Sequence, residues 1–374
     1  MKSIFNFDIC ENCTSCGACA FSCPVKAIEM KKNDDGNIRP VLARSCISCG
    51  KCFDICQIFN NKSKNVTYEK LFVYNNLNAI NSASGGFVYD LAKTFLSNGY
   101  IVYANYFNKS LSSVHERITD NVTLEKIKSS RYVKSSIFNI FSLIEQDLKA
   151  NRKVFIIGLP CELLAIKNVF KQGHIVYCAL CCGGSIPQAY FDCYKNYLSR
   201  KFKESIYSIN FRCKDYLPVP YCTKVEFENG TNKILNKYDG SFPNFLGTEF
   251  TMPSCYKCNK IETHEFDFVV GDSHIKNHHG TLVACSEKYM DLIEQKYIFK
   301  IESGLADIKK YFVYKKIMPF TYNNDKLVSF YKSLIKNYKK TVKFYIIQNL
   351  SFKGKISFSL PYSIKRKYLK IKER

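Results

Sequence analysis

Two common targeting features and one residue type are missing from the sequence. No window reaches the roughly 18 apolar residues that a membrane-spanning helix needs. No signal sequence of the charged, apolar and small-residue type is present. Tryptophan is absent from all 374 residues, a length that suits two or three domains. We therefore expect a soluble, cytoplasmic protein.

Acidic residues are scarce. Against 55 Lys and Arg there are only 32 Asp and Glu, so the formal net charge is +23. The excess is greatest in residues 305–374, which hold 18 cations and 3 acids. Lysines interleaved with Phe and Tyr in residues 325–374 suit nucleic acid or an anionic membrane surface. Because such runs are more commonly solvated helices, we expect no nucleic acid and retain peripheral membrane contact or an acidic redox partner.

Cysteine is abundant, and the pattern C-x2-C-x2-C-x3-C occurs twice before residue 60. The first run ends in Cys23-Pro24, as in bacterial two-cluster ferredoxins, where the fourth cysteine ligates the other cluster. A zinc site would use separated pairs, and a disulfide framework suits small secreted chains. We therefore predict two [4Fe-4S] clusters in a reducing compartment. The predicted ligands are Cys13, Cys16, Cys19 and Cys56 for the first cluster, and Cys23, Cys46, Cys49 and Cys52 for the second.

Gln57 departs from this pattern because a second proline is usual after the last cysteine. We expect it to weaken the turn after Cys56 and to leave the ligation intact. Cys10 lies upstream of the run and is interpreted as a spare thiol.

The remainder of the chain alternates strand and helix patterns, which predicts an α/β core. Continuous apolar runs at 153–158 and 175–180 suit strands buried on both faces. A polar stretch, residues 61–70, is interpreted as a linker. Further strands are expected at 71–74, 100–107, 266–271 and 281–284, and helices at 137–148 and 187–198, after residue 86 and after residue 161.

Small residues and cations stand near the starts of these helices. Ser84, Gly85 and Gly86 lie between a strand and a helix, where backbone N–H groups and the helix N-terminus favour an anion. The alternative is an ordinary helix start. Arg131 and Lys134 lie among serines further on, which suits an anion site or a solvated loop.

A metal half-site, Cys255-x2-Cys258, needs partners from elsewhere in the chain. Cys161 and Cys182 each follow the carboxyl end of a predicted parallel strand, and such ends converge on one crevice. Four thiolates can meet there, although a redox pair or a small zinc site is the alternative. Cys181 competes with Cys182, which we favour because it directly precedes the glycine pair.

The motifs outside the ferredoxin-like region occur in a recognisable order. They are Ser82-Ala83-Ser84-Gly85-Gly86, Ser130-Arg131-Tyr132-Val133, Gly158-Leu159-Pro160-Cys161, Cys182-Gly183-Gly184, Phe211-Arg212, Cys255-x2-Cys258 and Val270-Gly271-Asp272. Over roughly residues 70–300 the chain resembles the coenzyme F420 hydrogenase/dehydrogenase beta-subunit family. The resemblance implies FAD beside a third [4Fe-4S] cluster, ligated by Cys161, Cys182, Cys255 and Cys258. The residues expected to contact FAD are Ser82, Ser84, Gly85, Gly86, Arg131, Lys134 and Gly158.

The expected organisation follows from both lines of reasoning. It comprises a bacterial-ferredoxin-like βαββαβ module (1–62), a mixed-sheet α/β flavoprotein domain (70–304) and a basic, partly helical C-terminal extension (305–374). We expect a flavin-dependent iron–sulfur oxidoreductase that passes electrons from the ferredoxin clusters through the third cluster and FAD to an organic small molecule. Similar proteins serve bacterial surface-polysaccharide synthesis. The alternatives are an electron-transfer subunit of a larger redox complex and a basic-tail polyanion- or membrane-binding protein.

Several positions differ from the family pattern. Glu162 replaces a usual Gln, Gly183 a usual His and Thr281 a usual Ser. Ser273-His274-Ile275 follows the Gly-Asp pair, where the family has an aromatic pair ending in Trp-Gly. The substrate and the use of coenzyme F420 therefore stay open. No catalytic residue is assigned; the histidines at 274, 278 and 279 are more commonly loop residues.

Overall fold

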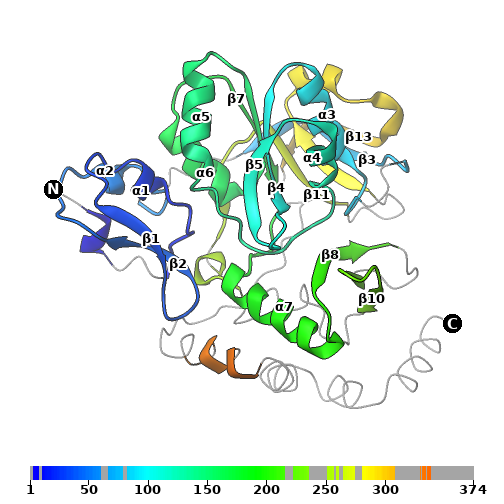
Figure 1. Ribbon diagram of the computed structural model, residues 1–374. Helices are drawn as coiled ribbons and strands as arrows, with labels where there is room; N and C mark the ends of the chain where they lie inside the picture. The colour runs from blue at the N-terminus through cyan, green and yellow to red at the C-terminus, as the bar shows by residue number, and fades with distance from the viewer. Residues whose placement is uncertain are drawn as a thin grey trace.

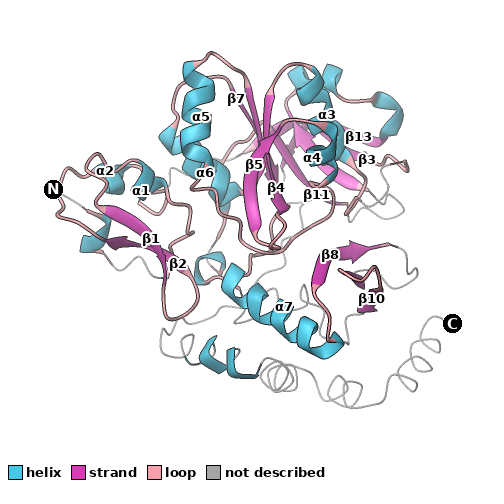
Figure 2. Ribbon diagram, viewed as in Figure 1, coloured by secondary structure: helices cyan, strands magenta, loops and turns pink. Residues whose placement is uncertain are grey.

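The computed structural model shows a mixed α/β protein, as the sequence predicts, with an N-terminal module beside a large central sheet and a smaller sheet beneath it (Figures 1 and 2). Among the described residues, no helix combines the length and apolar character needed to cross a bilayer. The structure describes residues 3–7, 11–59, 66–78, 82–214, 222–235, 251–256, 258–260, 264–273, 280–307, 329, 331–333 and 335–337.

The central sheet has eight strands in the order β13-β3-β12-β11-β7-β6-β4-β5. Its middle strands β4, β6, β7 and β11 run parallel, and the strands at both ends are antiparallel to their neighbours. The carboxyl ends of the parallel strands therefore meet at one edge. The strands are β3 (Thr67–Tyr74), β4 (Ile101–Phe107), β5 (Ser113–Ile118), β6 (Val154–Gly158), β7 (Ile175–Leu180), β11 (Phe268–Asp272), β12 (Thr281–Cys285) and β13 (Ile298–Asp307).

Helices cover both faces of this sheet, which explains the continuous apolar runs of its central strands. In β6, Val154 and Ile156 belong to one buried cluster, and Phe155 and Ile157 belong to the cluster on the other face. Alternate side chains of a strand point to opposite faces, so each face needs its own cover. The first face is covered by α5 (Ile140–Lys149) and α6 (Pro160–Val169), and the second by α3 (Phe87–Ser97) and α4 (Asn121–Glu125).

The N-terminal module packs against the α5 and α6 side of the central sheet (Figure 1). The Phe21 ring stacks on Phe141 with a centroid distance of 5.2 Å. Where the first strand of a βαββαβ module is expected, residues 4–6 form a 3-10 helix, and the described part of the module holds a single antiparallel hairpin. Its elements are η1 (Ile4–Asn6), α1 (Ala18–Phe21), β1 (Ile28–Lys32), β2 (Ile38–Leu42) and α2 (Lys51–Asp54).

A third layer joins one long helix to a small sheet of order β10-β9-β8. Phe191 and Tyr194 on the helix pack against Phe211 and Val225 of the sheet. Tyr331, from the C-terminal region, stacks on Tyr190 at a centroid distance of 5.2 Å. The elements are α7 (Gln188–Phe202), β8 (Ile206–Cys213), β9 (Cys222–Phe227) and β10 (Asn232–Leu235). Three 3-10 helices complete the described elements: η4 (Pro253–Cys255), η5 (Glu287–Leu292) and η6 (Gln295–Tyr297).

After residue 70, the strands and helices expected from the sequence are confirmed within the described residues, with small differences at their ends. Strand β3 begins at Thr67, inside the stretch interpreted as a linker, and β13 runs through the boundary expected at 304/305. Strand β5 was not expected because its Glu116 and Arg117 interrupt the apolar pattern. The three candidate histidines at 274, 278 and 279, Cys10, and most of the basic extension lie outside the described residues.

Candidate iron–sulfur and cofactor site

The two cysteine runs of the module share one backbone conformation. Ser15 and Ser48 have φ values of 57° and 53°, and Gly17 and Gly50 have φ values of 78° and 79°. Each glycine caps the N-terminus of a short helix in the left-handed region, which glycine adopts at little cost. The sequence repeat is therefore also a structural repeat, and each of the two loops carries three cysteines.

The first predicted set of thiols is gathered in one place. Burial, together with the neighbouring Cys16 and Cys56, raises the pKa of the Cys13 thiol to about 12. Burial, followed by Cys16, Cys13 and Cys56, raises the pKa of Cys19. Cys56 therefore lies near the thiols of the first run, and its assignment to the same cluster stays a prediction.

The second predicted set is more open. Cys46 and Cys49 are exposed, whereas Cys23 and Cys52 are buried in the small core of the module. Backbone N–H groups already point at two of these sulfurs: Ala27 N donates to Cys23 Sγ at 3.3 Å and Ser48 N to Cys46 Sγ at 3.3 Å. Such donors favour the thiolate form that binds iron.

A third set of thiols meets at the edge of the central sheet. Burial raises the pKa of the Cys182 thiol, and Cys255, Cys161 and Cys258 add to this effect. Burial with Cys161 and Cys258 raises the pKa of Cys255 to about 12. Cys161 lies in the first turn of α6, Cys182 follows β7 and Cys255 ends η4.

Cys181, the competing ligand, has a different setting from Cys182. Its N–H extends the sheet by donating to the Val270 carbonyl at 2.6 Å. Its side chain packs against the buried cluster on the α5 and α6 face of the sheet. These contacts favour Cys182 as the ligand.

The spacing of these thiols bears on what they can hold. Thiolates on one zinc ion, with bonds of about 2.3 Å, would lie roughly 3.8 Å apart. In the part of the chain that the structure describes, no group of three or more His, Cys, Asp or Glu side chains is close enough to hold a single metal ion. The thiols of the first and third sets nevertheless act on one another electrostatically, and an all-sulfur donor set suits iron–sulfur chemistry.

A cavity of about 400 Å³ opens at the carboxyl ends of the parallel strands. This is where open α/β sheets bind their ligands. The start of α3 contributes Gly86 to its wall, and the helix N-terminus favours an anion there. Cys181 and Cys182 both line the same cavity, so the third thiol set reaches this cavity through Cys182.

Five of the seven expected cofactor contacts line this cavity: Ser82, Ser84, Gly86, Arg131 and Gly158. The Ser82 hydroxyl is buried and has no hydrogen-bond partner within the described residues, so it is free for a ligand. The Arg131 guanidinium instead donates to the backbone carbonyls of Lys126, Ile127 and Ser129, and burial lowers its pKa to about 10.

The other two expected contacts lie elsewhere. A Cβ added to Gly85 would lie 2.0 Å from the Tyr74 carbonyl oxygen. The Gly85 N–H donates a hydrogen bond to Thr281 Oγ1 at 2.9 Å. Gly85 therefore lets α3 start close against the sheet. Lys134 is buried beside the third thiol set, where its Nζ donates to Glu162 Oε1 at 2.7 Å and lies 3.5 Å from Cys161 Sγ.

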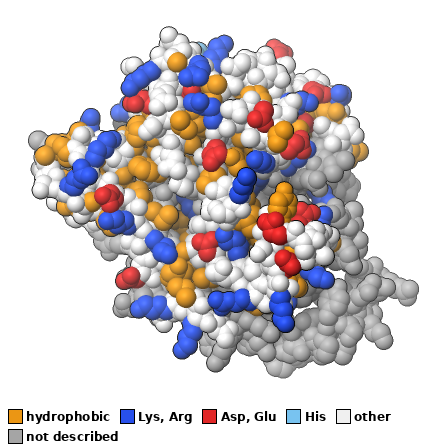
Figure 3. All heavy atoms as spheres, viewed as in Figure 1, with side chains coloured by type: hydrophobic (Ala, Val, Ile, Leu, Met, Phe, Trp, Pro, Cys, Tyr) orange, Lys and Arg blue, Asp and Glu red, His pale blue; other side chains and the backbone are white. Residues whose placement is uncertain are grey.

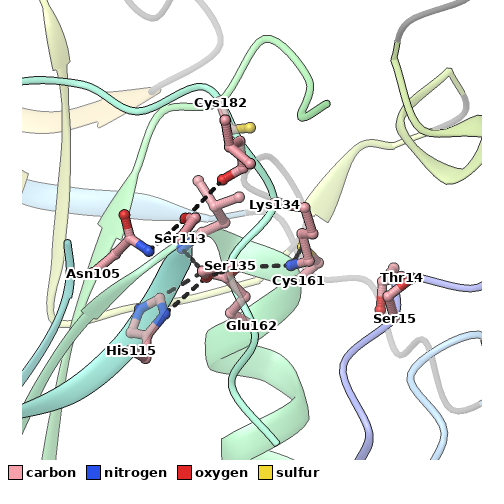
Figure 4. Close-up of polar contacts among 12 residues, drawn as sticks. Thr14, Ser15, Asn105, Ser113, His115, Lys134, Ser135, Cys161, Glu162 and Cys182 are labelled. Atoms are coloured by element: carbon pink, nitrogen blue, oxygen red, sulfur yellow. Dashed lines mark hydrogen bonds and ion pairs between the residues drawn. The ribbon is translucent and has the colours of Figure 1, made fainter. Parts of the chain in front are cut away.

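Around Lys134 the structure reveals a buried polar cluster that the sequence did not indicate (Figure 4). Ser135 Oγ donates to Glu162 Oε1 at 2.7 Å, and His115 Nδ1 lies 2.8 Å from Ser135 Oγ. Burial lowers the pKa of His115. Burial would raise the pKa of Glu162, but Lys134 holds that pKa below its usual value. In the sequence, Glu162 stood out only because it departs from the family pattern. No motif in the sequence indicated a role for His115.

A second unexpected contact joins the module to the sheet. Gln57 Nε2 donates to the Cys161 carbonyl at 2.7 Å and to Thr14 Oγ1 at 3.0 Å. Gln57 is only 3% exposed. The residue that departs from the ferredoxin pattern is thus the one that links a ligand loop of the module to the third thiol set.

Two family models and two known proteins match parts of this chain. Residues 12–59 match the model of a 4Fe-4S dicluster domain, and residues 151–303 match the model for the C terminus of the coenzyme F420 hydrogenase/dehydrogenase beta subunit. The chain is 27% identical over 168 residues to the coenzyme F420-dependent sulfite reductase of Methanocaldococcus jannaschii, a match that covers 42% of this chain and 25% of that protein. A chain of the F420-reducing [NiFe] hydrogenase complex from Methanosarcina barkeri aligns over 78% of this chain and 96% of its own, with 15% identity and a TM-score of 0.42.

The match to a dicluster domain and the two repeated cysteine runs indicate an iron–sulfur protein. Residues 151–303 are thus similar to the C terminus of the coenzyme F420 hydrogenase/dehydrogenase beta subunit, in keeping with the resemblance that the motifs indicated. The chain spans a quarter of the length of the curated relative that it matches.

Proposed function

We propose that this chain is a flavin-dependent iron–sulfur oxidoreductase that moves electrons between its ferredoxin clusters and an organic small molecule. The observation that supports this most is that Cys161, Cys182, Cys255 and Cys258 act on one another electrostatically and that Cys182 lines a cavity. These four residues would hold a third [4Fe-4S] cluster. The two module clusters would lie upstream of it.

The order of the clusters follows from the contacts between the module and the sheet. Cys16 and Cys161 both act on Lys134: burial alone would lower the pKa of Lys134, and these thiols help to raise it. Gln57, next to Cys56, contacts the Cys161 carbonyl. The cluster on Cys13, Cys16, Cys19 and Cys56 is therefore the neighbour of the third cluster, and the one on Cys23, Cys46, Cys49 and Cys52 is the outer one.

The cavity fits the phosphate-bearing part of FAD. The Ser82 hydroxyl has no hydrogen-bond partner among the described residues. Gly86 is the N-cap of α3 and lines the cavity, so this helix begins at the cavity wall. Gly158 has no side chain and leaves room at the edge of the sheet. A flavin accepts or donates two electrons and exchanges single electrons with clusters, so it would connect them to two-electron chemistry. The protein would bind and orient it against Cys182 and exclude water from the apolar strand ends. Surface-polysaccharide precursors are one substrate class in keeping with the family resemblance.

A second candidate function is an electron-transfer subunit whose chemistry takes place in a partner protein. The matched family is described as the beta subunit of a hydrogenase or dehydrogenase, which implies assembly with other subunits. A redox partner protein is therefore expected. On the visible face, Lys and Arg side chains are scattered among acidic and apolar ones (Figure 3), so this face has no single basic patch to suggest a membrane or polyanion site.

The test uses the full chain, purified anaerobically. The cofactor released by acid should be FAD, at about one per chain. The reduced protein should then be mixed with candidate organic acceptors, first alone and then with a candidate redox partner. Oxidation by an acceptor without any partner supports the oxidoreductase, oxidation only with the partner supports the subunit, and absence of flavin refutes the proposal.

A further inference from the structure

We infer that Lys134 raises the reduction potential of the third cluster by donating a hydrogen bond to Cys161, and that Glu162 limits this effect. The inference rests on the third cluster proposed above and adds a positioning pair that controls its energy. Reduction potentials of iron–sulfur clusters depend on nearby charge, on hydrogen bonds to sulfur and on solvent exposure. Lys134 meets all three criteria, because it is charged, contacts a ligand sulfur and is buried.

The backbone holds Lys134 in place from both sides. Tyr132 takes a left-handed conformation with φ of 61°, which turns the chain toward the segment that follows Cys182. Ile186 N donates to the Tyr132 carbonyl at 3.0 Å, and Lys134 N donates to the Ile186 carbonyl at 2.8 Å. The Lys134 side chain is therefore directed at the first turn of α6, where Cys161 lies (Figure 4).

The ammonium group is buried and has two partners on that turn. Its side chain is 7% exposed, and Nζ lies 2.7 Å from Glu162 Oε1 and 3.5 Å from Cys161 Sγ. Sulfur hydrogen bonds are longer than those to oxygen, so the contact to Cys161 is a charge-assisted hydrogen bond to a ligand sulfur.

Glu162 is fixed even more firmly. Its Oε1 also accepts from Ser135 Oγ at 2.7 Å, and its Oε2 accepts from Leu159 N at 2.8 Å. The side chain is 1% exposed. Because three donors hold the carboxylate, it stays in contact with the ammonium and does not follow changes at the cluster.

Reduction adds one negative charge to the cluster. A buried ammonium in contact with a ligand sulfur stabilises this charge, because charges interact strongly where water is excluded. Glu162 offsets part of that stabilisation with its own negative charge on the same ammonium. Removing the two charges one after the other should therefore shift the potential in opposite directions.

The experiment is an EPR-monitored redox titration of the full chain, prepared anaerobically, as wild type, as Glu162→Gln and as the double variant Lys134→Met with Glu162→Gln. The double variant avoids leaving Glu162 as an unpaired buried charge. Glu162→Gln should raise the potential of the third cluster. The reduction potential of the third cluster in the double variant should be lower than in Glu162→Gln by at least about 59 mV, which corresponds to a tenfold change in the equilibrium constant for one-electron reduction. The outer cluster, on Cys23 and Cys46, is the internal control and should not move.

Each contrary result has a distinct meaning. Equal potentials in the two variants would overturn the role of Lys134. A potential in Glu162→Gln below that of wild type would overturn the role of Glu162. Loss of the third cluster in the double variant alone would show that Lys134 serves assembly, which also overturns it. A wild-type chain with about eight irons and two cluster signals would refute the proposed third cluster itself, and the inference with it.

Discussion

The thiol sets of the module and of the central sheet are built in different ways. In the module, each loop carries three cysteines within seven residues, and both loops use the same left-handed serine and glycine. At the sheet, Cys161, Cys182 and Cys255 come from three separate segments: a helix start, a strand end and a 3-10 helix. The first kind of site is encoded locally, whereas the second exists only once the sheet has formed.

This difference has a physical consequence. A local loop needs only its own backbone conformation, so its ligands stay together when distant contacts change. The set at the sheet edge depends on packing between β7, α6 and the segment before β11. Substitutions in the sheet should therefore affect the third cluster and spare the module.

The largest expected effect comes from the ligands of the third set. Cys182→Ala should remove about four of twelve irons, because one missing thiolate leaves a four-iron cubane incompletely held. Cys181→Ala is the matched control and should keep all twelve, since the Cys181 side chain packs against the buried cluster on the α5 and α6 face of the sheet. Iron and sulfide analysis of both purified variants measures this. Loss of iron from Cys181→Ala instead would exchange the two assignments.

A weaker but still large effect is expected at Gly85. In Gly85→Ala, the new Cβ would meet the Tyr74 carbonyl oxygen at 2.0 Å, so backbone must move. We expect the free energy of unfolding to fall by about 3 kcal/mol, at the upper end for overpacking, with the third cluster lost before the module clusters. Urea unfolding and iron analysis check this.

Gly183→Ala is the control for Gly85→Ala, since a Cβ there meets nothing within 4 Å. Its unfolding free energy should stay within about 0.5 kcal/mol of wild type. Equal loss of stability in the two variants would contradict the close packing of α3 against the sheet.

The smallest expected effect concerns the junction between the two regions. Gln57→Ala removes the hydrogen bonds to Thr14 and to the Cys161 carbonyl, which should cost about 1–3 kcal/mol of unfolding free energy because buried partners are left unpaired. It should also slow electron transfer from the module to the third cluster, as followed by rapid freeze-quench EPR.

Asn168→Ala tests whether that slowing is specific. Asn168 Nδ2 donates to the Ile55 carbonyl at 3.1 Å across the same junction, and this contact involves no proposed ligand. We expect a small loss of stability and an unchanged electron-transfer rate. A rate that falls equally in both variants would mean that Gln57 acts only by holding the junction together.

The sequence predicted best what is local or periodic. The module loops followed from spacing, and the positions of Cys161 and Cys182 followed from apolar runs that end at one sheet edge. Lys134 was expected at a phosphate because the sequence shows only a cation near Arg131. The direction of the Lys134 side chain depends on the left-handed backbone conformation of Tyr132. It also depends on an isolated β-bridge between Val133 and Ile186, which joins segments that are distant in the sequence.

Other features lay beyond the sequence because they depend on tertiary contacts. Gln57 was interpreted as a weakened turn, yet it gains its role from the Cys161 carbonyl, more than a hundred residues away. His115 lies on β5, a strand that the sequence did not indicate because Glu116 and Arg117 interrupt its apolar pattern. The contact between His115 and Ser135 forms only when β5 packs beside the 129–135 segment.

The most direct test of the central claim is the iron content of the anaerobically purified full chain. Three four-iron clusters predict about twelve irons and twelve sulfides per chain. A value of about eight irons, with both module clusters intact, would show that the thiols at the sheet edge hold no cluster and would contradict the account.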